Sequence, residues 1–133
     1  MKEPRWVPRI VVEAVHLDQL REHGGLQGLR DDNALEASLA RARQKWTSEP
    51  KSDLSTVAAA CAFGIAKAHP FNDGNKRSAF LAMTIFLGLN GKEVDASETE
   101  VVQLMVALAS GSLTESQMAS WVRDHLTRYT PAT

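Results

Sequence analysis

The sequence predicts an all-α protein, a bundle of about six helices in one domain that spans residues 1–133. Apolar residues recur at helical spacing through most of the chain, and no long run alternates apolar with polar residues as a strand would. Capping residues, glycines and prolines stand between these segments. The 133 residues, of which 44% are hydrophobic, are enough to build one core.

The first two helices are separated by a glycine-rich link. Apolar spacing predicts a helix over residues 8–22, which the sequence His-Gly-Gly at 23–25 ends. The sequence Asp-Asp-Asn at 31–33 offers an N-cap for a second helix, which fades near Trp46. Residues 46–53 contain Thr, Ser, Pro and Lys, and they predict an exposed loop.

The third helix is predicted over residues 54–68, with Ser52 or Asp53 as its cap. Its repeated alanines permit a close approach of neighbouring helices, so we expect it to be the central helix of the bundle. Pro70 disfavours helical geometry in the residue before it, His69, and the helix therefore ends at that point.

The second half of the chain predicts three more helices. The fourth begins near Gly74 or Asn75 and continues to about residue 89, where Asn-Gly at 90–91 stops it. Residues 92–95 are a short stretch that is compatible with extended backbone. Two capping boxes then open a fifth helix over 97–108 and a sixth over 114–126.

Composition excludes several classes of function. A net charge of −1 and a pI near 6.4 argue against a protein that binds nucleic acid through its phosphate backbone. Cys61 is the single cysteine, so it forms no disulfide within the chain and is predicted to be a core residue. Residues 1–5 lack the apolar region of a secretory signal, and the apolar run at 79–89 is shorter than the roughly 20 residues of a membrane span. We therefore expect a cytoplasmic protein without membrane or nucleic-acid partners.

The most informative segment is residues 69–77, His-Pro-Phe-Asn-Asp-Gly-Asn-Lys-Arg, between the third and fourth helices. The first turn of a helix has unpaired N–H groups and the positive end of the helix dipole, which together bind anions. Gly74 permits close approach of a phosphate to the backbone, and Asn75 follows it at the start of the helix. Lys76 and Arg77 add cationic donors at the same helix end, where two cations in a row are otherwise unfavourable.

The same segment supplies the other groups that phosphoryl transfer requires. His69 is the only strong proton acceptor in it and is predicted to be the catalytic general base. Asp73 offers hard oxygen ligands for a Mg²⁺ ion that bridges phosphates. Phe71 is predicted to point inward and anchor the loop. Each of these residues also has a purely structural interpretation: His69 as a helix-terminal histidine, Asp73 as a helix cap, and the two cations as a solvated pair.

The remaining histidines and one tryptophan have simpler interpretations. His16 lies on a largely apolar helical stretch and is predicted to be a packing residue. His23 is a cation at a helix C-terminus, and His125 is predicted to lie on the surface of the last helix. Trp46 either guides a target segment or packs against the protein.

The motif resembles the signature of the Fic/Doc superfamily, His-x-Phe-x-(Asp/Glu/Ala)-x-Asn-(Gly/Lys)-Arg. The sequence upstream, at residues 10–16, 24–25, 28–31 and 35–39, looks like the amino-terminal half of Doc-type proteins, so the similarity covers most of the chain. Lys76, where typical adenylylating Fic enzymes have Gly, resembles the Doc (death-on-curing) branch. The residues that match the signature are His69, Phe71, Asp73, Asn75, Lys76 and Arg77.

This resemblance implies a fold, a set of roles and a biological setting. The fold is a Fic/Doc-type bundle with the active loop between the third and fourth helices. His69 takes the proton of a target hydroxyl, Asp73 holds Mg²⁺, and residues 74–77 bind the phosphates of ATP. The implied protein is the toxin of a toxin–antitoxin pair, which transfers the γ-phosphate of ATP to a threonine of elongation factor Tu or to another protein target and inhibits translation. A Phd-like antitoxin is the implied inhibitor.

Two other functions remain open at this point. Pro70 and Gly74 resemble the broader Fic pattern, which implies transfer of a nucleotidyl group (AMPylation) to a protein hydroxyl. Phe80, which stands in place of the second arginine of many Fic motifs, favours the Doc branch again. The alternative from another class is a catalytically inactive binding module.

Overall fold

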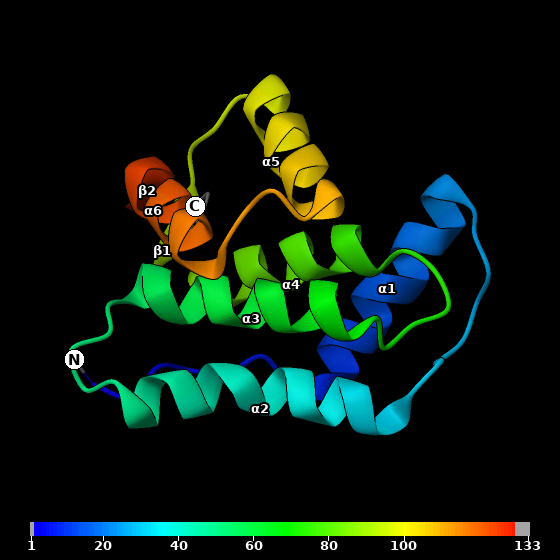
Figure 1. Ribbon diagram of the computed structural model, residues 1–133, viewed down its shortest axis with the longest axis horizontal. Coiled ribbons are helices and arrows are strands. Elements are labelled where there is room, and N and C mark those ends of the chain that lie inside the picture. Colours follow the sequence, from blue (N-terminus) through cyan, green and yellow to red (C-terminus); the bar gives the residue numbers. More distant parts are fainter. Residues whose placement is uncertain (1, 130–133) are drawn as a thin grey trace.

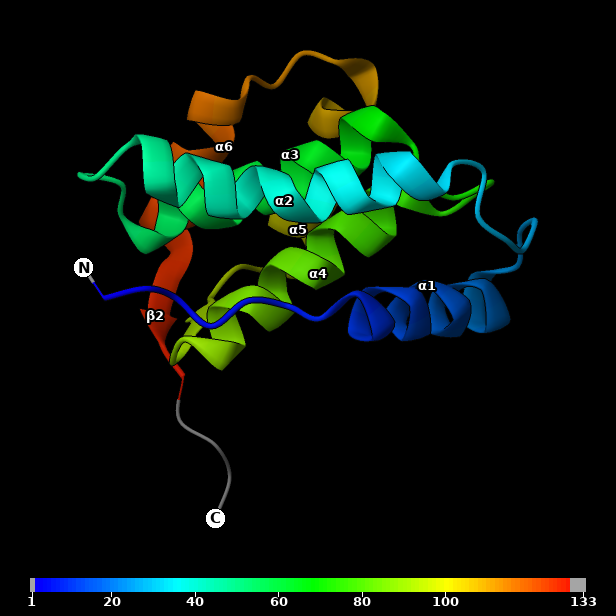
Figure 2. The same ribbon diagram turned by 90° about the horizontal axis from the view of Figure 1, so that it is seen from below.

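Helix α3 (Leu54–Ala68) is the central element of the fold. Ten of its fifteen residues are buried, and most of those are alanine or glycine, so helices on several sides pack closely against it. Figure 1 shows α3 between α2 (Asp32–Ser48) on one side and α6 (Glu115–His125) on the other. Figure 2 shows α4 (Asn75–Leu89) beneath α2 and α3, and α1 (Arg9–His23), in dark blue, to the right of α4. The predicted central position of the third helix is therefore confirmed.

The computed structural model describes residues 2–129 and confirms the all-α class. In addition to the helices it contains one two-stranded antiparallel sheet, in which Lys92 pairs with Arg128 and Val94 with Leu126. None of the helices in this range combines the length and the hydrophobicity that a membrane crossing requires. The remaining elements are β1 (Lys92–Val94), α5 (Glu98–Ser110) and β2 (Leu126–Arg128).

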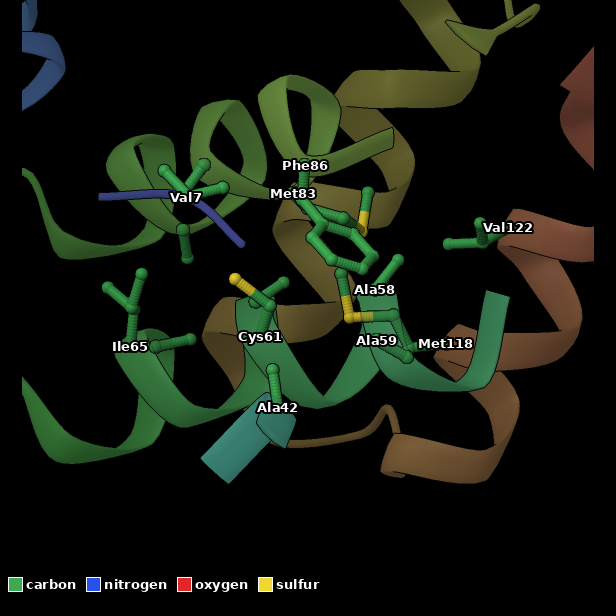
Figure 3. Packing of buried hydrophobic residues seen from close by; sticks show 14 of the residues in the cluster. Val7, Ala42, Ala58, Ala59, Cys61, Ile65, Met83, Phe86, Met118 and Val122 are labelled. Atoms are coloured by element: carbon green, nitrogen blue, oxygen red, sulfur yellow. The ribbon is translucent and has the colours of Figure 1, made fainter. Parts of the chain in front are cut away.

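The core lies where α3, α4 and α6 meet. Figure 3 shows Ala58 and Ala59 of α3 close to Met83 and Phe86 of α4, with Met118 of α6 beside them. These side chains are at most 1% exposed. Cys61 is also buried there, as predicted, and burial without a polar partner raises the pKa of its thiol to about 12.

The helix starts follow the predicted capping chemistry. The carboxylates of Asp31 and Asp53 accept the N–H groups of residues three positions later, at 3.1 and 2.9 Å. Ser97 and Thr114 each form a complete capping box with the residue at the third helical position, Glu100 and Gln117 respectively.

Several helix ends differ from the sequence prediction by one or two residues, and two of these differences have a visible cause. Helix α2 continues to Ser48, so the predicted loop over residues 46–53 begins only at 49; Trp46 packs edge-on against Trp6, with 6.3 Å between ring centroids, and so holds the extra turn in place. The last helix ends at His125 rather than at Leu126, because the chain leaves it to pair with β1. A strand of three residues has too little alternation to be recognised from the sequence.

His125 is not a surface residue as predicted. Its side chain is 19% exposed and stacks on the Trp121 ring, with 4.1 Å between centroids. Its Nδ1 lies 2.7 Å from the Trp121 carbonyl and its Nε2 lies 2.7 Å from the Glu100 carboxylate, so it joins the last turn of α6 to the first turn of α5.

Candidate active site

The segment with the predicted site residues is the loop between α3 and α4, at the end of the molecule where α1 also ends (Figure 1). His69 follows the last residue of α3 and has left-handed backbone geometry, with φ 50° and ψ 57°. That geometry costs a residue with a Cβ roughly 1–2 kcal/mol, so the surrounding structure must hold it. The side chain of His69 is exposed.

The chain between α1 and α2 runs antiparallel to this loop and fixes it. Leu29 and Phe71 form an isolated bridge, and the N–H of Asn72 donates to the Gly28 carbonyl at 3.0 Å. The N–H of Arg30 donates to the Pro70 carbonyl at 2.8 Å, and its guanidinium donates to the His69 carbonyl at 2.6 Å. Nothing in the sequence motif indicated that Arg30 belongs to the site.

Phe71 and Asn75 form the buried part of the loop. The Phe71 ring is 2% exposed, and Asn75 is 8% exposed. The Asn75 side chain accepts the N–H of Phe71 and donates to its carbonyl, both at 2.9 Å, and so closes the loop on itself. Each polar atom of this amide is engaged with Phe71, which leaves the second N–H of Nδ2 and the backbone N–H of Asn75 as the donors available to a phosphate.

His16 of α1 is buried beneath the loop. Its ring stacks on that of Phe71, with 3.7 Å between centroids and 7° between planes, and its Nε2 lies 2.8 Å from the Asp73 carbonyl. A carbonyl only accepts, so Nε2 carries the proton. The sequence predicts the packing role; the hydrogen bond across the loop is what it misses.

Asp73 presents an exposed carboxylate beside the start of α4. One oxygen accepts the N–H of Gly74 at 3.0 Å and the other lies 3.4 Å from the N–H of Leu26, which leaves further lone pairs free. Among residues 2–129 no three His, Cys, Asp or Glu side chains come together as a metal site of their own. The arrangement fits Mg²⁺, which usually binds one or two protein carboxylates and otherwise phosphates and water.

The start of α4 has the features of an anion site. Gly74 is its N-cap with φ 75°, and no side chain caps the first N–H groups of the helix. Lys76 and Arg77 lie in the first turn and line the pocket that this helix end faces. An anion at this position would meet the free N–H groups, the helix dipole and two cationic side chains together.

A pocket of about 740 Å³ brings the predicted residues together. Its polar side is formed by the motif, while another wall is a largely apolar face of α5, which was not predicted to belong to the site. The apolar wall could have been inferred from the spacing of Val102 and Val106, which lie one helical turn apart and are exposed in the structure. Phe71 lies outside the pocket. The motif residues that line it are His69, Asn72, Asp73, Gly74, Asn75, Lys76 and Arg77, and the α5 residues are Glu98, Val101, Val102, Met105, Val106 and Ala109.

Comparison with known proteins relates this chain to one family. The model of the Fic/DOC family matches residues 6–87. Protein kinase doc of Escherichia phage P1 is 34% identical over 110 residues, which cover 83% of this chain and 86% of that protein. Among solved structures, the N-terminal Fic domain of a putative cell filamentation protein from Bartonella quintana, with bound ADP, matches at a TM-score of 0.45 and 18% identity. That match covers 70% of this chain and 47% of the other. The family-model match and the identity to a Doc kinase over most of both sequences show that the chain belongs to the Fic/DOC family.

Proposed function

We propose that this protein is a toxin of the Doc type, a kinase that transfers the γ-phosphate of ATP to a hydroxyl of a target protein. The observation that carries the proposal is the pocket in which His69, Asp73 and the cation-bearing start of α4 meet. The 34% identity to protein kinase doc supports phosphoryl transfer as the reaction. Lys76, in the position where nucleotidyl-transferring relatives have Gly, supports it as well.

The groups in the pocket divide the work of the reaction. The N–H groups at the start of α4, together with Lys76 and Arg77, bind the phosphates. Asp73 would hold Mg²⁺, which when bound neutralises charge on the phosphate oxygens. His69 accepts the proton of the target hydroxyl as that oxygen bonds to the γ-phosphorus and the bond to the ADP oxygen breaks. The exposure of His69 is consistent with a protein substrate, which must approach from solvent.

The biological setting that we propose follows the Doc relatives. The target is a threonine of elongation factor Tu or another cytoplasmic protein, and its modification stops translation. A Phd-like antitoxin restrains the enzyme in the cell. We propose this role for the protein in the cytoplasm, as one partner of a toxin–antitoxin pair.

Nucleotidyl transfer is the second candidate reaction. The residues that favour it are Pro70 and Gly74, which belong to the broader Fic pattern, and Gly74 takes the left-handed geometry that suits a glycine. In that reaction the same hydroxyl would attack the α-phosphorus, and pyrophosphate would leave.

Labelled ATP separates the candidates. Purified protein is incubated with elongation factor Tu, Mg²⁺ and ATP labelled at either the γ or the α position. We expect label transfer from the γ position and a target mass increase of one phosphate. Transfer from the α position instead would establish nucleotidyl transfer.

Substitution of His69 tests whether catalysis occurs at all. Removal of the general base in His69→Ala is expected to lower the transfer rate by about 10²–10⁴-fold. ATP binding should stay within about threefold of wild type, because no phosphate contact is removed. If His69→Ala still arrests growth when it is expressed, the protein acts by binding and the enzymatic proposal is wrong.

A further inference from the structure

We propose that Arg30, which lies outside the motif, is the residue that positions His69 for proton transfer. This inference rests on the proposed function, in which His69 is the base. It adds a residue from the link between α1 and α2 whose side chain acts on the backbone of His69 and not on substrate.

The Arg30 side chain bonds the C-terminal end of α3. Its Nε donates to the His69 carbonyl at 2.6 Å and its Nη2 donates to the Ala68 carbonyl at 2.8 Å. The last carbonyls of a helix have no donor within the helix, and Pro70 cannot supply one because it lacks an N–H. The guanidinium supplies the missing donors through two hydrogen bonds, and its positive charge is favourable at the negative end of the helix dipole.

These bonds hold the peptide groups on both sides of His69. The side chain of Arg30 binds the carbonyls of Ala68 and His69, while its backbone N–H binds the carbonyl of Pro70. Rotation about the His69 backbone would break at least one of them. Because the direction of the Cα–Cβ bond follows from φ and ψ, the same bonds fix where the imidazole points. The left-handed geometry of His69, unusual for a residue other than glycine, is therefore retained by Arg30.

The guanidinium of Arg30 has no recorded partner within residues 2–129 other than the carbonyls at the end of α3. Within residues 2–129 it forms no ion pair with a carboxylate, whereas Arg9, Arg41 and Arg123 all do. Both of its side-chain bonds go to the carbonyls at the end of α3. A planar fork of N–H groups can span two neighbouring carbonyls, and the point charge of a lysine cannot reproduce that geometry.

Substitution of the side chain isolates this role, because the backbone bond to Pro70 is kept. Arg30→Met retains the aliphatic length and removes the donors. We expect its kcat to fall by about 10–100-fold, as is usual when a reacting group is misplaced by about 1 Å. The dissociation constant for ATP should stay within about threefold, since no phosphate ligand changes. Arg30→Lys should recover part of the lost rate.

The matched control is Arg43→Met, which removes an arginine of α2 that lies over the Trp6 ring and leaves the loop untouched. Its rate is expected to equal that of wild type. A wild-type rate in Arg30→Met would overturn the proposal. So would an unchanged kcat accompanied by weaker ATP binding, because Arg30 would then be a phosphate ligand.

A crystal structure of Arg30→Met tests the positioning without any assay of transfer. We expect φ of His69 to leave the left-handed region and the imidazole to move away from the pocket. An unchanged His69 in that structure would overturn the inference even if the kinase proposal held. If wild-type protein transfers no group from ATP, the kinase proposal is wrong. The crystal structure of Arg30→Met then remains as the test of whether Arg30 fixes the position of His69.

Discussion

Asn75 shows how one side chain sets the shape of the loop. The sequence motif predicts that it binds phosphate, and in the fold its Oδ1 and Nδ2 are both hydrogen-bonded to the backbone of Phe71. The side chain is 8% exposed, so water cannot replace either bond. The amide thus ties the first turn of α4 to the residue that anchors the loop, and so supports the helix start at which we propose that phosphate binds.

Loss of this amide should destabilise the protein measurably. Asn75→Ala leaves the N–H and the carbonyl of Phe71 without partners in a buried place, which we expect to lower the free energy of unfolding by about 1–3 kcal/mol. Urea denaturation measures the change. Asn72→Ala is the control, because it removes one exposed bond, from Nδ2 to the Gln27 carbonyl, and should cost only about 0.5 kcal/mol. Equal losses in the two variants would contradict the role assigned to Asn75.

The link between α1 and α2 acts on the site as an element. Gly25 has φ 128°, and a Cβ at this position would lie 2.9 Å from Oδ2 of Asp73 and 2.9 Å from the Leu20 side chain. Gly24, with φ 77°, has open space around it, since a Cβ there would meet no atom within 4 Å. An alanine at either position would therefore be strained by the left-handed backbone, but only at position 25 would its Cβ also collide with other side chains.

This difference yields a prediction for the proposed Mg²⁺ site at Asp73. In Gly25→Ala the new methyl group must displace the Asp73 carboxylate, so we expect the Mg²⁺ concentration for half-maximal transfer to rise several-fold. Gly24→Ala should lose about 1 kcal/mol of stability from backbone strain alone and keep the wild-type Mg²⁺ dependence. Magnesium titrations of the transfer rate decide the matter, and an identical shift in both variants would mean that strain, not contact with Asp73, is responsible.

Helices, caps and motif were predictable because their determinants are close together in the sequence. Asp31, Asp53, Ser97 and Thr114 cap helices through residues only three positions away. Most of the missed features depend on contacts between residues far apart in the sequence. Strand β2 exists only because β1, far along the chain, pairs with it.

The same distinction between local and long-range determinants applies to the candidate site. The motif residues that line the pocket are close together in the sequence, and their pattern was visible in it. The supporting bonds were not, because Arg30 reaches across 39 residues to the His69 carbonyl and His16 reaches across 57 to the Asp73 carbonyl. A pattern of neighbouring residue types carries no information about partners at such separations.

At the scale of the whole molecule, the pocket depends on how α5 is held against the rest. Only Leu104 and Leu108 of this helix are fully buried, so polar contacts at its start add to its attachment. His125 of α6 supplies one of them, to Glu100 of the capping box. A carbonyl faces one ring nitrogen of His125 and a carboxylate faces the other, so both nitrogens must donate and the ring is protonated when both bonds form.

Two pKa shifts define the pH range of this contact. The Trp121 carbonyl, and then the Glu100 carboxylate, raise the pKa of His125 above its ordinary 6.5; the stability that this provides is complete below pH 6.5 and is lost as pH rises through the raised value. The Ser97 N–H, followed by His125, lowers the pKa of Glu100 from 4.5 to about 2; that contribution is complete above pH 4.5 and is lost as pH falls toward 2. The contact is therefore strongest between pH 4.5 and 6.5.

We expect raising the pH from about 5.5 to about 8.5 to weaken the attachment of α5 through His125. In His125→Phe the ring still stacks on Trp121 but carries no proton, so the urea midpoint of wild type should exceed that of the variant by more at the lower pH than at the higher. The neighbouring Asp124, which also favours the protonated ring, is present in both proteins and cancels in the comparison.

Glu100→Gln is the second probe: a glutamine preserves the capping box, as Gln117 does in α6, and removes only the charge that faces His125. Its midpoint should likewise approach that of wild type as the pH rises and His125 loses its proton. A difference between wild type and His125→Phe that is the same at both pH values would mean that the protonation of His125 does not change over this range, and the proposed pH-dependent attachment of α5 would be wrong.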